Sequence, residues 1–141
     1  MANEIKVALR QVSASTTEAA MGKHHVLIDR PEAKGGTDAG PMGGQLFLSA
    51  IGGCFMSNLL AAMKARNTDV SNVHTEVTGT IVDAPPRFVA VEVNVTAEGG
   101  DPDELKHLVQ IADRGCIMMN TLREKLDVKI HVRTSKSAVG R

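Results

Sequence analysis

The sequence predicts an α+β fold in which antiparallel strands cover a long central helix. The segment from Gln45 to Met63 contains no charged residue, and a helix that is apolar on all sides is typical of a protein core. Segments in which apolar and polar residues alternate lie on both sides of it, as expected of strands with one buried face. A second helix, with one apolar face, is predicted after Asp101.

The first part of the chain is predicted to form two strands and a loop. Apolar residues alternate with polar or small ones over residues 5–10 and again over residues 25–29. Between Pro31 and Gly44 the chain contains two prolines and five glycines, which predicts a loop.

The central helix is predicted from about Gln45 to about Arg66. It contains the pair Gly52-Gly53, and each glycine costs roughly 1 kcal/mol relative to alanine inside a helix. Such a pair predicts that another segment packs close to the helix backbone, next to Cys54.

Two strands are predicted after this helix, joined by the segment Ala84-Pro85-Pro86-Arg87. The first has one face made of Val73, Thr75, Val77, Gly79 and Ile81. The second has one face made of Val89, Val91, Val93 and Val95.

A helix start is marked by Asp101 as N-cap, Pro102 at the first position and Glu104 at the third. The helix has an apolar face, and Gly115 suits its end. This face comprises Leu105, Leu108, Val109 and Ala112. Cys116 is then predicted to begin a short helix that reaches about Leu126, and a last strand contains Val128, Ile130 and Val132.

Length and charge exclude several classes of protein. The 141 residues suit a single domain, residues 1–141, with its own hydrophobic core. The 16 basic and 16 acidic residues cancel, and there is no Trp or Tyr to stack on bases, so no nucleic-acid partner is expected. Residues 45–63 are long enough to span a membrane, but polar residues interrupt them, so we expect a core helix and no membrane partner.

The residues before Val7 show no basic stretch followed by an apolar core, so we expect no signal peptide and a cytoplasmic protein. Two cysteines in that compartment are expected to be thiols. The five histidines are dispersed, and no spacing typical of metal ligands accompanies them. No glycine pair is followed by the Lys-Ser/Thr of a phosphate loop. We therefore expect no metal and no cofactor.

The cysteines are the candidate catalytic residues. A reactive cysteine must be a thiolate, whereas an unperturbed thiol has a pKa of about 8.5. Cys116 is predicted at a helix N-terminus, where unpaired N–H groups favour an anion. Cys54 is predicted in apolar surroundings that would raise its pKa, so it needs a partner such as an arginine from another segment. Taken singly, a cysteine is more often a small buried apolar residue than a reactive one.

Two segments resemble the OsmC/Ohr family. Residues Gly40–Phe55, with the preceding Gly35–Asp38, resemble a signature that runs Gly-Pro, then Pro-x-Glu-Leu, then a helix rich in small residues ending in Gly-Cys or Ala-Cys-Phe. Residues Ala112–Asn120 are similar to the second cysteine motif, in which Cys-Pro precedes Ser or Asn. The order of elements agrees over nearly the whole chain, and the general OsmC-like branch fits better than the organic hydroperoxide resistance branch.

The resemblance implies a thiol peroxidase that reduces organic hydroperoxides and forms an intertwined homodimer with active sites at the subunit interface. Cys54 matches the position that attacks the peroxide, and Cys116 matches the resolving position. A dithiol reductant would reopen the resulting disulfide. A pocket formed by Phe47, Ile51, Phe55 and nearby methionines would suit an alkyl hydroperoxide.

The sequence departs from the family pattern at the groups that activate the first cysteine. The family has a Glu in the loop before the helix, where this chain has Gly44 and Gln45. The family's Arg lies in the first hairpin turn, but residues 13–21 contain no arginine, and Arg10 and Arg30 lie nearby. Ile117 replaces the proline. These departures favour a second hypothesis, a catalytically weak relative that binds a small apolar or thiol-reactive ligand at the dimer interface.

Overall fold

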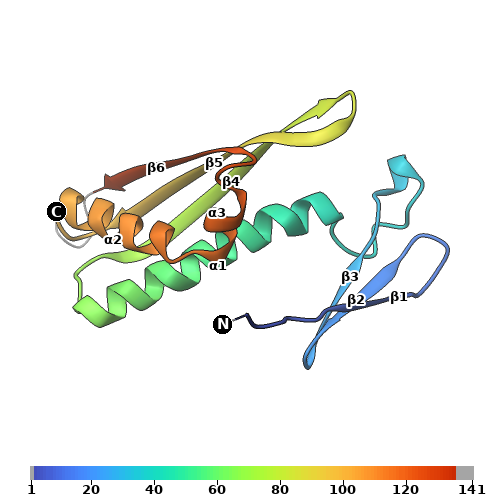
Figure 1. Cartoon of the computed structure of the whole chain (residues 1–141), viewed down its shortest axis with the longest axis horizontal. Helices are drawn as coiled ribbons and strands as arrows, with labels where there is room; N and C mark the ends of the chain where they lie inside the picture. The colour runs from blue at the N-terminus through green and yellow to red at the C-terminus, as the bar shows by residue number, and fades with distance from the viewer. Residues whose placement is uncertain (1, 136–141) are drawn as a thin grey trace. The chain divides into compact units, whose positions relative to one another are not determined.

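The computed structural model describes residues 2–135 of the chain (Figure 1). The chain forms two compact units, one ending at Phe47 and the other beginning at Leu48. The first unit contains an antiparallel sheet in the order β1-β2-β3. Its strands are β1 (Ala8–Gln11), β2 (Thr17–Met21) and β3 (His24–Ile28). In this unit, Leu9 pairs with Ala19, and Ala19 pairs with Val26.

The structure confirms two predicted strands of this unit and adds one. The strand predicted at residues 5–10 begins only at Ala8, and Ile5 is 87% exposed. The strand predicted at residues 25–29 corresponds to β3. Strand β2 was not predicted, because its Thr-Glu-Ala-Ala-Met sequence has no apolar–polar alternation and alanine favours helices. It is a strand because its backbone pairs with β1 and β3.

The segment after β3 is a loop, as predicted, with one 3₁₀ turn (Glu32–Lys34). The Asp29 carboxylate organises it and is only 3% exposed. Its oxygens accept hydrogen bonds from the Thr16 hydroxyl at 2.9 Å and from the Thr37 hydroxyl at 2.6 Å. Three backbone N–H groups also donate to it, those of Arg30 at 2.7 Å, Thr37 at 3.1 Å and Ala39 at 3.2 Å. A buried carboxylate is stable here because five donors compensate for its loss of water.

The central helix is α1 (Gly43–Arg66), which begins in the first unit and continues through the second. Its bounds agree with the prediction, although it starts two residues earlier. Among the described residues, α1 is the helix long and apolar enough to cross a membrane, a criterion that core helices of soluble proteins also meet. Its buried residues lie on one face, which comprises Ile51, Gly52, Phe55, Leu59 and Ala62.

The second unit contains a three-stranded sheet in the order β4-β5-β6. Its strands are β4 (Ser71–Asp83), β5 (Pro86–Glu98) and β6 (Asp127–Ser135). Strands β4 and β5 are antiparallel, but β6 runs parallel to β5, so this sheet is mixed rather than purely antiparallel. The parallel pairing is possible because α2 (Pro102–Arg114) and α3 (Ile117–Leu122) form the crossover between β5 and β6 (Figure 1). The predicted α+β class is confirmed.

The helices cover one face of this sheet. The residues of β5 that are buried alternate with residues that are at least partly exposed, such as Glu92 and Asn94. The buried set is Val91, Val93, Val95 and Ala97. Helix α2 contributes the four apolar residues predicted for its buried face. The core of the unit therefore lies between β5 and the helices.

One part of the predicted strand pattern is wrong. The register of β4 and β5 shifts between Thr80 and Ile81, which reverses the alternation. As a result Ile81 is 57% exposed. The ring of Phe88 instead lies against Gly79, so close that a β-carbon there would come within 2.5 Å of the ring.

The caps of α2 agree with the prediction. The Asp101 side chain accepts a hydrogen bond from the Asp103 N–H at 3.0 Å, and Gly115 is the C-cap. Helix α3 is shorter than predicted, because it ends at Leu122 and turns occupy the residues before β6. Lys125 and Leu126 both donate to the Leu122 carbonyl, which closes these turns.

Candidate functional site: a cysteine pair

Cys54 lies in the middle of α1 and is partly exposed. The glycine pair before it was predicted to allow close packing, and this is confirmed for Gly52 only. A β-carbon at Gly52 would come within 2.9 Å of the Val77 side chain on β4, so the helix lies directly on the sheet. A β-carbon at Gly53 would meet nothing within 4 Å. Close contact at Gly52 therefore packs α1 against β4 two residues before Cys54.

Cys116 lies at the turn between α2 and α3, where it is the N-cap of α3 and fully buried. Its backbone is extended, with φ −83° and ψ 118°. The end of α2 holds this turn, because the Gly115 N–H donates to the Ile111 carbonyl and the Cys116 N–H donates to the Asp113 carbonyl, both at 3.2 Å. The cysteine side chain makes no capping hydrogen bond to its own helix.

The structure brings the two cysteines, which are far apart in the sequence, into hydrogen-bond contact. Burial raises the pKa of Cys54, but hydrogen bonds from the Met118 N–H, the Cys116 thiol and the Ile117 N–H outweigh it. The pKa of Cys54 is therefore lower than that of an ordinary thiol. Two of these donors are N–H groups in the first turn of α3, which have no partner within the helix.

The second thiol shifts in the opposite direction. Burial raises the pKa of Cys116, and the neighbouring Cys54 raises it further. Together these outweigh the lowering by the N–H groups of Met119 and Met118, so the pKa of Cys116 is above its ordinary value. The N–H groups at the start of α3 thus favour the Cys116 anion, as expected from the sequence, but burial and the neighbouring Cys54 outweigh them. The same end of α3 also lowers the pKa of Cys54.

Cys54 was predicted to need a partner such as an arginine, but none of the three donors that lower its pKa is a guanidinium. Arg10 forms an ion pair with Glu18 at 2.8 Å within the first hairpin. Gln45, one of the two positions that could match the family's Glu, accepts a hydrogen bond from the Met42 N–H at 2.9 Å and so caps the start of α1. Both residues therefore have local structural roles.

Two residues of the predicted apolar pocket are not available to a substrate in the described chain. Ile51 is 1% exposed and Phe55 is fully buried, since both belong to the core. Ile117, which follows Cys116, is 68% exposed and presents an apolar side chain beside the cysteine pair. Within residues 2–135, no group of three or more His, Cys, Asp or Glu side chains could hold a metal ion.

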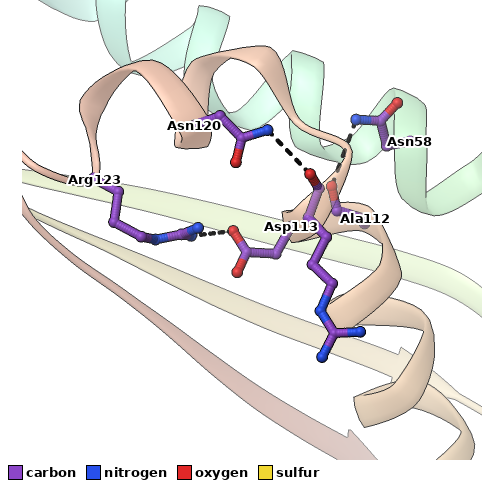
Figure 2. A network of polar contacts seen from close by, with 6 residues as sticks. Asn58, Ala112, Asp113, Asn120 and Arg123 are labelled. Atoms are coloured by element: carbon purple, nitrogen blue, oxygen red, sulfur yellow. Dashed lines mark hydrogen bonds and ion pairs between the residues drawn. The ribbon is translucent and has the colours of Figure 1, made fainter.

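Sequence reasoning did not identify a set of polar residues around the turn that carries Cys116 (Figure 2). Asn58, on α1, donates to the Ala112 carbonyl at 3.5 Å, and Asn120, on α3, donates to the Arg114 carbonyl at 3.0 Å. One signal in the sequence does exist for Asn58, which lies four residues after Cys54 and therefore on the same face of the helix.

Comparison with solved structures shows the same fold in proteins with few identical residues. A hypothetical protein from Aquifex aeolicus VF5 has a TM-score of 0.83 at 16% identity, over 96% of this chain and 99% of that chain. An OsmC-like protein from Mycoplasma pneumoniae has a TM-score of 0.80 at 18% identity, over 96% and 99%. The organic hydroperoxide resistance protein OhrB of Bacillus subtilis has a TM-score of 0.67 at 23% identity, over 93% and 98%.

No curated protein matches the chain by sequence. A family described as OsmC-like protein does match, over residues 35–131. This match covers more than half of the chain and includes both cysteines, α1 and the mixed sheet up to His131. It agrees with the resemblance of the two cysteine motifs and with the fold of the solved structures. The chain belongs to the OsmC-like protein family.

Proposed function

We propose that this protein is a cysteine-based peroxidase that reduces organic hydroperoxides, with Cys54 as the attacking cysteine and Cys116 as the resolving cysteine. The observation that carries the proposal is the contrast between two thiols in contact. Cys54 is partly exposed and has a lowered pKa, whereas Cys116 is buried and has a raised pKa. A pair of this kind offers a thiolate for attack and keeps a protonated thiol beside it.

The proposed reaction has three steps, which are attack on the peroxide, formation of the disulfide and its reduction. The Cys54 thiolate attacks one oxygen of the hydroperoxide, the O–O bond breaks, and the alkoxide takes a proton from water and leaves as an alcohol. Cys54 is then a sulfenic acid. The Cys116 sulfur attacks it, an S–S bond forms, the S–O bond breaks, and the hydroxyl group leaves as water with the thiol proton. A dithiol reductant supplies two electrons and two protons, restores both thiols and leaves as its own disulfide.

Two further features support this assignment. Similar folds include solved proteins that are described as organic hydroperoxide resistance proteins, from Bacillus subtilis and from Elizabethkingia anophelis. The exposed Ile117 side chain gives the surroundings of the thiol an apolar character, which suits an alkyl group better than hydrogen peroxide. We place the protein in the cytoplasm, where thiols remain reduced between turnovers.

The test follows loss of cumene hydroperoxide in the presence of a dithiol. We expect turnover by the wild type, and a loss of at least about a thousandfold in Cys54→Ser, since a hydroxyl cannot replace the thiolate. Intact mass after one equivalent of peroxide is expected to show the loss of two hydrogens, because a disulfide forms between the cysteines. Absence of turnover, or turnover that survives Cys54→Ser, contradicts the proposal.

A second candidate function is the binding of a small apolar or thiol-reactive ligand. It is favoured by the departures from the family pattern, since Gln45 is uncharged and caps α1, and Arg10 forms an ion pair with Glu18. In this case the wild type would remain unmodified by the hydroperoxide, and a thiol-reactive ligand would add its own mass at Cys54. The same mass spectrum therefore separates the two functions.

The protein is proposed to work as a homodimer. The face of α1 opposite the sheet is uncovered in the described chain and consists mostly of small residues, with Leu60 49% exposed. The small exposed residues are Ser49, Ala50, Gly53, Ser57 and Ala61. Small residues allow two helices to approach closely, so the same face of a second copy would fit here. Sedimentation analysis tests this, and Leu60→Glu is expected to give monomers.

A further inference from the structure

The turn between α2 and α3 is held from both sides by side chains that take no part in the reaction proposed above. Asn120 donates from its amide to the Arg114 carbonyl at 3.0 Å, which bridges the chain across Cys116 (Figure 2). One turn further along, the Arg123 guanidinium forms an ion pair with the Asp113 carboxylate. These two contacts join the end of α2 to α3 and leave Cys116 inside the loop that they close.

A third contact joins the same turn to the helix of the other cysteine. The Asn58 amide reaches the Ala112 carbonyl at 3.5 Å and lies beside Gly115, where a β-carbon would be 3.8 Å away. Because Asn58 is one helical turn after Cys54, it ties the turn to α1 near the attacking sulfur. We call Asn58, Asp113, Asn120 and Arg123 the turn clamp.

We propose that the turn clamp regulates the oxidation state that the cysteine pair reaches, by holding Cys116 against Cys54 so that the disulfide forms before Cys54 is oxidised further. Asn120 and the Asp113–Arg123 pair are positioning residues in this scheme, because they act only through Cys116. The effect of the clamp on the oxidation of Cys54 by peroxide rests on the proposed function. The effect of the clamp on the stability of the disulfide does not rest on it.

Two reactions compete for the sulfenic acid of Cys54. Attack by the Cys116 sulfur gives the disulfide and water, and its rate depends on how often the buried thiol is in position. Attack on a second hydroperoxide breaks another O–O bond, transfers one oxygen to give the sulfinic acid, and releases an alcohol. Loosening the turn slows the first reaction and leaves the second unchanged, since the second needs only Cys54 and peroxide.

The first measurement needs no peroxide. The full-length protein is equilibrated in glutathione redox buffers, and the fraction with the Cys54–Cys116 disulfide is measured by intact mass. The variants are Asn120→Ala and Arg123→Gln. Alanine is the better helix former, so Asn120→Ala removes the bridge without weakening α3. The matched control is Thr121→Ala, since the Thr121 hydroxyl donates at 2.7 Å to the Ile117 carbonyl within α3.

We expect Asn120→Ala and Arg123→Gln each to lower the equilibrium constant for the disulfide by about fivefold, the factor that corresponds to one hydrogen bond of ordinary strength. The control is expected to match the wild type. Circular dichroism establishes that each variant is folded, and either clamp variant suffices if the other does not fold. Equal constants in all four proteins overturn the inference.

The second measurement exposes the same proteins to increasing cumene hydroperoxide. We expect the clamp variants to accumulate sulfinic acid, a gain of two oxygens at Cys54, at about fivefold lower peroxide than the wild type and the control. If the wild type forms no oxidised Cys54 at all, the proposed function fails, and the glutathione measurement still decides the role of the clamp. If oxidation occurs with the same division between products in every protein, the clamp inference alone fails.

Discussion

Two side chains in this protein are held by backbone N–H groups that stabilise a negative charge, Asp29 in the first unit and Cys54 in the second. Asp29 accepts from three N–H groups and two hydroxyls and is almost completely enclosed. Cys54 accepts from two N–H groups and one thiol and remains partly exposed. Backbone N–H groups stabilise the anion in both places, but one acid is an enclosed carboxyl group and the other is a partly exposed thiol.

This difference gives Asp29 a structural role and Cys54 a chemical one. A carboxyl group ionises at about pH 4, so a further lowering of its pKa leaves it charged throughout the neutral range, and an enclosed carboxylate serves to hold its hydrogen-bond donors in place. A thiol ionises at about pH 8.5, so a modest lowering of its pKa increases the thiolate near neutral pH, where an accessible sulfur reacts. The hydrogen bond from the Thr37 hydroxyl is the largest cause of the lowered pKa of Asp29.

The largest effect is expected for Asp29→Asn, which removes a carboxylate that accepts five hydrogen bonds. The pKa of Asp29 in the folded chain lies well below the unfolded value of about 3.9, so its stabilising contribution is present above about pH 4 and is lost as the pH falls. The variant should be clearly less stable than the wild type near neutral pH, with a gap that narrows by about pH 3.

Urea unfolding followed by circular dichroism measures this gap, since the chain has no Trp or Tyr for fluorescence. Asp38→Asn, at an exposed carboxyl in the same loop, is the control and should differ little from the wild type. A gap for Asp29→Asn that stays constant from neutral to acidic pH would show that the charge of Asp29 is not the stabilising feature.

The next effect is expected for Ile117→Pro, which removes one N–H donor from Cys54. The position suits proline, because it is the first residue of α3 and the preceding Cys116 already has the extended backbone that proline favours. We expect the pKa of Cys54 to rise and its alkylation rate below that pKa to fall about fivefold. Ile117→Ala keeps the N–H and is the control. Equal rates in the two variants would exclude the N–H as a cause of the lowered pKa.

A smaller effect is expected when the thiol donor is removed. Cys116→Ala deletes the S–H that donates to Cys54, whereas Cys116→Ser keeps an O–H donor at the same place. The pKa of Cys54, measured from the pH dependence of alkylation, should be higher in the alanine variant. We expect a rate difference of roughly threefold below that pKa, because S–H is a weak donor. A higher pKa in the serine variant would contradict the hydrogen-bond assignment.

An effect smaller than that of Asp29→Asn is expected for Thr37→Val, which removes one of two hydroxyl donors to Asp29 and leaves the Thr37 N–H in place. The pKa of Asp29 should rise but remain below its ordinary value, because the other four donors remain. Stability near neutral pH should lie between those of the wild type and Asp29→Asn. Urea unfolding at that pH is the measurement, and a loss as large as that of Asp29→Asn would mean that Thr37 has another role.

The sequence was sufficient for the elements that depend on local patterns. The apolar run and its flanking residues predicted α1, and Asp101 with Pro102 predicted the start of α2, because a cap and a helical period are properties of neighbouring residues. It was insufficient for β2 and for the parallel direction of β6. Both depend on partner strands, which a short segment does not specify.

The same distinction between local and long-range causes applies to the candidate site. From the sequence alone, Cys54 could be placed on an apolar helix and Cys116 at the start of another, and the motifs around them indicated the family. Only the tertiary structure decided which thiol is stabilised as an anion, because the N–H groups of α3 lower the pKa of both cysteines, and burial and the neighbouring thiol decide the net direction. Burial and the contact between the thiols depend on packing between two helices, which no local pattern in the chain records.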